Sequence, residues 1–192
     1  MSLQIGNDKI KEIYYGSDKI KEVYYGSELV WSGAEPSYEK PSYMILTNGT
    51  RIDFEIDNTP IANLGVFSPS MIINGVSYTK TTIKEIHLES SYNGVTEIGT
   101  YFLYSCTSLT DATLDLPTLN SVGASFLGGC SSLVNVTLTA ETPPIAASVG
   151  FLNNTRRLTS IYVPFSAVNS YKNTLPWRSH SSLIKPIRLV IG

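Results

Sequence analysis

The sequence is poor in the residues that catalytic and metal sites most often need. Its 192 residues include only two cysteines, Cys106 and Cys130, and two histidines, His87 and His180. This set is too small and too scattered for a structural zinc site. No phosphate-binding loop and no Gly-x-Gly-x-x-Gly motif occurs either. We therefore expect no metal and no cofactor.

Two further absences narrow the classes of function. The net charge is -2 and the pI is about 5.7, so we expect no basic surface for a phosphate backbone and no nucleic-acid partner. No apolar run reaches the length of a membrane span, and the N-terminus lacks the charged-then-apolar order of a secretory signal. Either the protein leaves the cell without such a signal, or the signal has been lost.

What the sequence does contain is a repeat. Equivalent residues lie 24 positions apart in five pairs: Ile98 and Val122, Phe102 and Phe126, Cys106 and Cys130, Leu109 and Leu133, Leu114 and Leu138. This period, with a Leu-x-x-Val-x-Leu ending, indicates a leucine-rich solenoid. The Gly99 and Gly123 steps predict a turn into a short helical return, with Phe102 and Phe126 filling the space between coils. One unit cannot bury its apolar face without neighbouring coils.

Four segments align as strand positions of this solenoid: residues 83–88, 109–114, 133–138 and 158–163, at spacings of 26, 24 and 25. Parallel stacking places equivalent outward positions about 4.8 Å apart. Three polar rows follow: Glu85, Asp111, Asn135 and Ser160; His87, Thr113, Thr137 and Tyr162; Glu89, Asp115 and Thr139. Solenoids commonly bind partners on such a surface. A merely solvated face is the alternative.

The cysteines occupy one repeat position, which favours a buried ladder of two reduced thiols. A cysteine nucleophile needs a histidine partner, but His87 projects from the strand side of the coil and His180 lies in the C-terminal tail. Glu85 and Asp111 are a weak candidate for a hydrolytic pair, since nothing indicates a deep pocket. The four strand carboxylates lack the oxygen spacing of a known calcium motif. We expect the protein not to be an enzyme.

Residues 1–43 have a different organisation. A ten-residue repeat in residues 5–31 predicts a three-strand β-meander, within a ribbon domain of residues 1–33. The ribbon carries a set of aromatic residues, Tyr14, Tyr15, Tyr24, Tyr25 and Trp31. These either pack on the solenoid or form an assembly surface for self-association or attachment. Residues 34–43, with two prolines, read as an extended linker.

The remaining chain, residues 44–192, is the predicted solenoid domain. Asn-Gly steps within residues 44–56 and 71–78 predict two β-hairpins, and we assign residues 44–82 as an N-terminal cap. Residues 83–163 hold the repeats, and residues 164–192 form a C-terminal cap. In that cap we expect a short helix over residues 167–173 and three apolar side chains, Trp177, Ile184 and Ile187, against the last coil. The fold class is thus mainly β with short helices.

The repeat resembles a known family. The pattern Ile98-Gly99-x-x-Phe102-x-x-x-Cys106-x-Ser108-Leu109-x-x-Ala112-x-Leu114, repeated from Val122 to Leu138, is similar to the BspA-like (Treponema-type) leucine-rich repeats. The resemblance implies a non-enzymatic recognition scaffold, as used on bacterial surfaces and in phage particles. The N-terminal phrase Lys-Ile-Lys-x-Ile-Tyr-x-Gly-Ser is similar to N-terminal segments of phage tail and fibre proteins of Gram-positive hosts.

Together these features predict a phage or prophage tail-associated protein of the virion, which presents the repeat face for host-surface binding. Its partners would be a protein or glycan on a cell surface and other virion proteins, with homo-oligomers formed through the ribbon. The alternative is a bacterial surface or secreted adhesin that binds a host protein or glycan. A polysaccharide-active enzyme has the least support.

Overall fold

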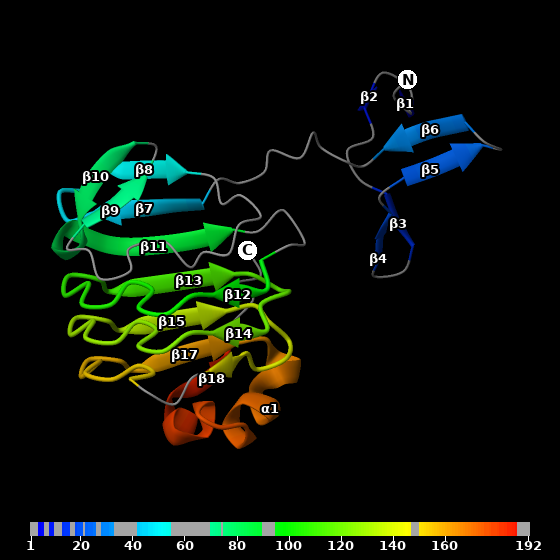
Figure 1. Ribbon diagram of the computed structural model, residues 1–192. Helices are drawn as coiled ribbons and strands as arrows, with labels where there is room; N and C mark the ends of the chain where they lie inside the picture. The colour runs from blue at the N-terminus through cyan, green and yellow to red at the C-terminus, as the bar shows by residue number, and fades with distance from the viewer. Residues whose placement is uncertain are drawn as a thin grey trace. The chain divides into compact units, whose positions relative to one another are not determined.

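The structure, a computed structural model, describes residues 4–5, 8–9, 13–15, 18–20, 22–25, 28–32, 42–54, 70–73, 75–89, 95–146 and 150–187 (Figure 1). The chain divides into two compact units, Met1–Lys40 and Pro41–Gly192. This boundary falls inside the predicted linker. The last two linker residues, Ser42 and Tyr43, are already part of a strand.

The described residues of the N-terminal unit form six short strands: β1 (Gln4–Ile5), β2 (Asp8–Lys9), β3 (Ile13–Tyr15), β4 (Asp18–Ile20), β5 (Glu22–Tyr25) and β6 (Glu28–Ser32). They pair antiparallel as β1–β2, β3–β4 and β5–β6. The predicted three-strand meander is therefore replaced by three hairpins. Each ten-residue repeat supplies two strands, because a Gly-Asn or Gly-Ser step separates the paired strands in the sequence. The aromatic side chains of the predicted assembly surface lie outside what the structure describes.

The second unit is organised by a seven-stranded sheet in the order β18-β17-β15-β13-β11-β7-β8. Its strands are β7 (Ser42–Leu46), β8 (Arg51–Phe54), β11 (Ile83–Glu89), β13 (Asp111–Asp115), β15 (Asn135–Leu138), β17 (Ser160–Val163) and β18 (Ile184–Pro186). The five strands from β11 to β18 run parallel. The β7–β8 hairpin continues the sheet antiparallel beyond β11. The prediction of a mainly β protein with short helices is confirmed.

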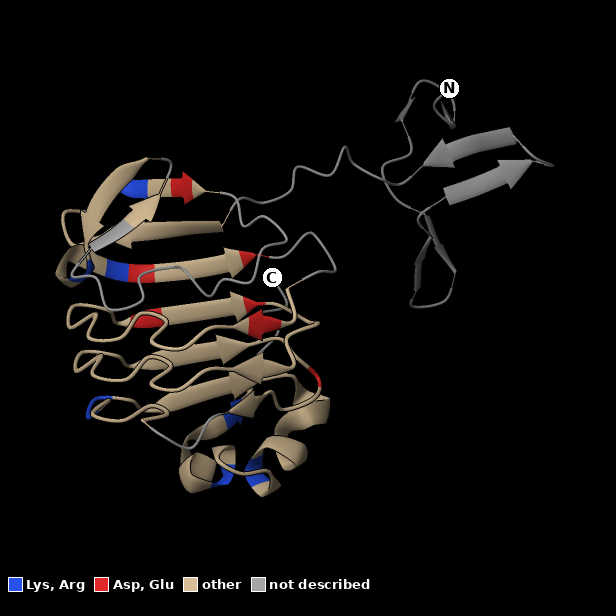
Figure 2. Ribbon diagram, in the orientation of Figure 1, with Lys and Arg blue, Asp and Glu red and all other residues tan. Residues whose placement is uncertain are grey.

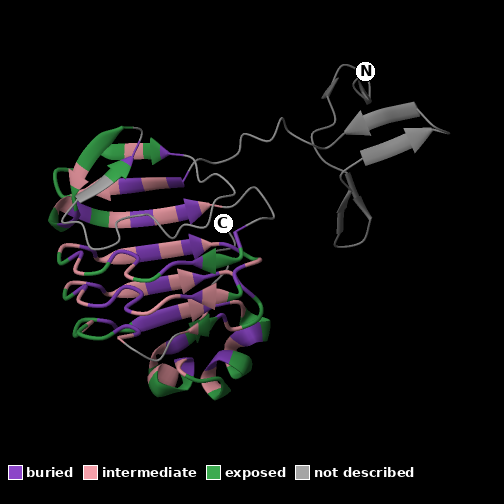
Figure 3. Cartoon of the chain, in the orientation of Figure 1, coloured by how far each residue is buried: buried purple, intermediate pink, exposed green. Residues whose placement is uncertain are grey.

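The register between the parallel strands is the one that the repeat predicted. Glu85 pairs with Asp111, Asp111 with Asn135, and Asn135 with Ser160. Buried and half-buried residues alternate along β13 and β15 (Figure 3). The buried positions of one row are Ile86, Ala112, Val136 and Ile161.

A second parallel ladder was not predicted. It consists of β12 (Glu97–Ile98), β14 (Ser121–Val122) and β16 (Ile145–Ala146), with one strand from each coil. Coils approach closely at its end: a Cβ on Gly123 would lie 2.4 Å from the backbone nitrogen of Thr100. Any side chain there would force the two backbones apart, which explains why the repeat has glycine at this position.

The short helical return predicted after these glycines is wrong. Residues 100–105 form turns in which every second residue has a positive φ: Tyr101, Leu103 and Ser105. Positive φ recurs in the next two coils at Ser125, Leu127, Gly129, Gly150, Leu152 and Asn154. Such residues cannot continue a right-handed helix. Their amides instead bond between coils, as in Tyr101 N–H to Ala124 O at 2.8 Å, and this bonding offsets the backbone strain.

The phenylalanines do fill the space between coils as predicted. Phe102, Phe126 and Phe151 form a stack with ring centroids 6.1 Å apart at each step. Trp177 ends the stack with its centroid 4.7 Å from that of Phe151 and a T-shaped geometry. Tyr171 in turn contacts Trp177 edge to face. One aromatic column therefore runs through the coils into the C-terminal segment.

The C-terminal segment contains η3 (Phe165–Ala167), α1 (Val168–Asn173) and η4 (Trp177–Leu183). The predicted helix is confirmed, and both Tyr171 and Trp177 are fully buried. Each also satisfies its polar atom. The Trp177 indole donates to Pro144 O at 2.7 Å, and the Tyr171 hydroxyl donates to Ala140 O at 3.0 Å. The last turns of the chain are thereby fixed to the preceding coil.

Both predicted hairpins are also confirmed. β7 and β8 are joined around Gly49, and β9 (Ser70–Ile73) pairs antiparallel with β10 (Val76–Thr79) around Gly75. Both glycines have the positive φ that such turns need. Met44 of β7 is fully buried in the same core as the repeat leucines, so this hairpin is part of the hydrophobic core of the unit.

The aromatic column gives a direct test of coil packing. Phe126 is fully buried between two other rings, so Phe126→Ala should lower the free energy of unfolding by roughly 3–5 kcal/mol. Phe165 is 84% exposed, and Phe165→Ala, the matched control, should change it by less than about 0.5 kcal/mol. Urea unfolding followed by circular dichroism measures both. Equal effects of the two substitutions would contradict the packing role of the column.

Candidate binding face

The half-buried side of the strands from β11 to β17 is the candidate site, and we call it the polar strand face. Its predicted members with intermediate exposure are Glu85, His87, Glu89, Asp111, Thr113, Asp115, Asn135, Thr137, Thr139 and Tyr162. Since adjacent strands are in register, these side chains form continuous rows across the sheet. The structure thus brings together all but one of the predicted face residues.

The exception is Ser160, which was predicted to be exposed and is only 3% exposed. The repeat pattern does not predict that β18 adds a further parallel strand beside β17. Lys185 of β18 donates to the Ser160 hydroxyl at 2.8 Å and to Thr159 O at 3.1 Å. The lysine side chain therefore covers this end of the face.

Charges are distributed unevenly over the face. Acidic residues lie on β11 and β13, whereas β15 and β17 carry no charged residue (Figure 2). In the first row, the Lys84 ammonium lies 3.0 Å from Glu85, and the Asn135 amide donates to Asp111 at 2.8 Å. Each carboxylate of this register pair thus has a polar partner. The face changes from acidic at its first strands to neutral and then, at Lys185, to basic.

Two residues that sequence reasoning missed complete the second row. Tyr43 of β7 stacks on His87 with centroids 5.0 Å apart and an interplanar angle of 3°. The Arg51 guanidinium lies 3.8 Å from the centroid of the Tyr43 ring. The row therefore begins with an Arg–Tyr–His stack. The repeat cannot indicate it, because β7 pairs antiparallel with β11 and has no equivalent in the other coils.

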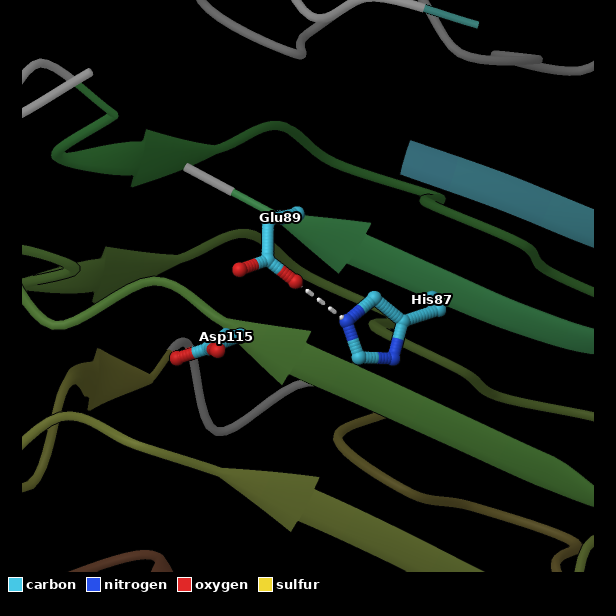
Figure 4. A group of neighbouring side chains, drawn as sticks. All are labelled: His87, Glu89 and Asp115. Atoms are coloured by element: carbon cyan, nitrogen blue, oxygen red, sulfur yellow. Dashed lines mark hydrogen bonds and ion pairs between the residues drawn. The ribbon is translucent and has the colours of Figure 1, made fainter. Parts of the chain in front are cut away.

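Three groups with metal-binding chemistry lie where the second and third rows adjoin: His87 of the second row, and Glu89 and Asp115 of the third. His87 Nε2 lies 2.8 Å from Glu89 Oε2, and Asp115 is the register partner of Glu89 on β13. One ligand atom from each residue lies within 4.8 Å of the others. Figure 4 shows the three side chains on adjacent strand ends. Sequence reasoning expected no metal and did not combine these residues.

The cysteines lie on the inner side of the coils, away from this face. Both are unpaired thiols with no exposed surface, as the prediction of a buried, reduced ladder requires. The pKa of Cys106 lies well above its ordinary value, because Cys130 hydrogen-bonds to the protonated thiol and burial opposes ionisation. Cys130 itself donates to Leu103 O at 3.1 Å. A thiol held in the protonated form is a poor nucleophile.

The row of the cysteines has a member that sequence reasoning missed. The turn in which Leu109 N–H donates to Cys106 O recurs with Ile83 and Lys80. Lys80 therefore occupies the cysteine position of the first coil, and it is only 5% exposed. Burial lowers its pKa, against the influence of the two thiols. The spacing of 26 residues between Lys80 and Cys106 was the available signal.

Comparison of the chain with protein-family models identifies one matching family. Residues 55–175 match the BspA type leucine rich repeat region, in six copies. Since the match covers more than half of the chain, the protein belongs to this family. Membership suggests a protein-interaction or adhesin-like role. No curated protein matches the chain significantly. In the part of the chain that the structure describes, no helix is long and apolar enough to cross a membrane.

The second histidine, His180, lies beside the aromatic column and gives a pH-dependent prediction. Its ring centroid is 5.9 Å from that of Phe151, and burial lowers its pKa from 6.5. As pH falls through 6.5, the unfolded chain takes up a proton that the folded protein still excludes, so the protein should lose stability. The loss stops growing below the folded-state pKa. Melting temperatures from pH 8 to pH 5 should fall more steeply for the wild type than for His180→Gln.

Parallel pH profiles of the two proteins would contradict this account. The quantity to compare is the difference in melting temperature between the wild type and His180→Gln at each pH, because other groups of the protein titrate over the same range.

Proposed function

We propose that this protein is a non-catalytic recognition protein that binds a protein or glycan of a cell surface through the polar strand face. The observation that carries the proposal is the unbroken register of half-buried polar side chains over β11, β13 and β15. A rigid row of short polar groups can meet a partner without losing much side-chain entropy. The interaction role of the repeat family supports the same reading.

In this proposal the repeats form a solenoid with a cap at each end. The β7–β8 hairpin covers the outer edge of β11, and the segment around Tyr171 and Trp177 covers the last coil. Terminal units of a solenoid must protect apolar surface that inner units bury against each other. A non-catalytic role is supported by the protonated state of the Cys106 thiol.

The proposed setting is a phage or prophage tail. The support is the N-terminal ten-residue repeat, which is similar to segments of phage tail and fibre proteins, and which lies outside the leucine-rich region. In this setting the N-terminal unit attaches or assembles the protein, with Tyr14, Tyr25 and Trp31 among its contact residues. The localisation would be the virion. A bacterial surface or secreted adhesin is the second candidate, favoured by the adhesin-like role of the family.

A double substitution tests the polar strand face. Thr113→Arg with Thr137→Arg places two long cations at the centre of the face, and we expect binding to fall at least tenfold through steric and charge mismatch. Retention of the labelled protein on a panel of bacterial cells and immobilised glycans measures the effect. Thr107→Arg, at an exposed turn position, is the matched control. Equal retention of the double variant and the control would reject this face as the binding site.

The oligomeric state distinguishes the two settings. Light scattering should be measured on the full chain and on a version that begins at Ser42, the first residue of β7. A phage tail component should form trimers or larger assemblies that become monomers on truncation. A monomer in both cases would leave the N-terminal unit without an assembly role and move the adhesin to first place.

A further inference from the structure

The first strands of the polar strand face bring together three side chains that can bind a metal ion. His87 and Glu89 are two residues apart on β11, so both project from the same side of the sheet. Asp115 pairs with Glu89 in the next strand and projects from that side as well. An imidazole and two carboxylates therefore converge from two rigid strands, as the close-up view shows (Figure 4).

We propose that His87, Glu89 and Asp115 bind a divalent metal ion of the zinc type. An imidazole nitrogen with two carboxylate oxygens suits Zn²⁺ and its neighbours Co²⁺ and Ni²⁺ better than Ca²⁺, which prefers six to eight oxygens. This assignment is independent of the proposed function. Three protein ligands would leave at least one coordination position for water or for a group of a partner.

The distances are compatible with such an ion after a small movement of side chains. Donor atoms in a tetrahedral site with bonds of about 2.1 Å lie roughly 3.4 Å apart. Here the donor atoms all lie within 4.8 Å of one another, and His87 Nε2 lies 2.8 Å from Glu89 Oε2. In such a site the contact between His87 and Glu89 would lengthen, which requires the Glu89 side chain to rotate.

The surroundings hold two of the three ligands in place. Tyr43 stacks flat on the His87 ring, and Arg51 in turn lies over Tyr43. Ser42, which is 2% exposed, accepts from the Glu89 amide at 2.9 Å and donates to its carbonyl at 3.3 Å. Outer contacts that orient ligands are typical of metal sites. The ring plane and the backbone of the carboxylate ligand are thus fixed before an ion binds.

Electrostatics gives an independent reason for a cation at this point. Carboxylates at directly paired positions of adjacent strands repel each other. At the pair Glu85 and Asp111, Lys84 and Asn135 each supply a polar partner. At the pair Glu89 and Asp115, His87 is the one partner among the described residues, and it contacts Glu89. A divalent ion would offset both charges.

Calorimetric titration of the full chain with Zn²⁺, after removal of metals by a chelator, tests the assignment. We expect one ion per chain. Affinity should fall at least tenfold in His87→Gln and in Asp115→Asn, since even loss of an outer contact costs about 10- to 100-fold. Two matched controls, Glu85→Gln on the same face and His180→Gln in the C-terminal segment, should bind as the wild type does.

Two further measurements complete the test. Zn²⁺ should raise the melting temperature of the wild type but not of Asp115→Asn. Without metal, that variant should melt at the wild-type temperature or above it, because the carboxylate repulsion is gone. Titration with Co²⁺ should give visible bands without thiolate charge transfer. The proposal would be overturned by any of three results: the absence of saturable binding, the appearance of thiolate charge-transfer bands, or a loss of affinity in Glu85→Gln equal to that in Asp115→Asn.

Discussion

The structure depends on one constraint, which is the parallel pairing of each coil with the next at an offset of 24 to 26 residues. This pairing is made three times around each coil: in the main sheet, in the β12–β14–β16 ladder, and through the turns between them. Backbone groups that a helix would satisfy internally are satisfied here by the neighbouring coil. Left-handed residues such as Leu103 and Leu127 are stable only in this context, so a coil is not an independent unit of structure.

Every coil needs a neighbour, so the first and last coils must pair with segments that are not repeats. These end segments add side chains to the polar strand face that the repeat does not supply. At the first end, β7 pairs antiparallel with β11 and contributes Tyr43 and Ser42 to the side chains of that strand. At the other end, β18 adds a parallel strand, and Lys185 covers Ser160. Of the inner coils, one contributes Asp111 and Asp115 from β13, and the next contributes uncharged residues such as Thr137 from β15. The elements that close the stack therefore add aromatic and basic groups to a face that is otherwise acidic or neutral.

The sequence predicted what the repeat itself determines. The strand positions, their register, the stacked phenylalanines and the buried thiols all follow from equivalent residues at a constant spacing, and the structure agrees with each. The predictions are wrong where the repeat is interrupted, or where contacts between neighbouring coils determine the backbone conformation. The turn at Tyr101 has no local signal for a left-handed backbone, since tyrosine rarely adopts it. The burial of Lys80 was not predicted because a lysine at a core position contradicts the apolar pattern. The burial of Ser160 depends on β18, which follows β17 after 20 intervening residues.

The constant register also has opposite consequences on the two sides of the sheet. Inside, it places like residues next to each other, and stacked phenylalanines gain from that arrangement. Outside, it places carboxylate next to carboxylate, which is unfavourable. At Glu85 and Asp111 the problem is solved by neighbouring polar side chains, and the pair is compatible with a purely structural role. At Glu89 and Asp115 the repulsion remains in a half-buried position beside an oriented imidazole. A bound cation would offset this repulsion, and it would give one part of the polar strand face a chemistry that the repeat alone does not supply.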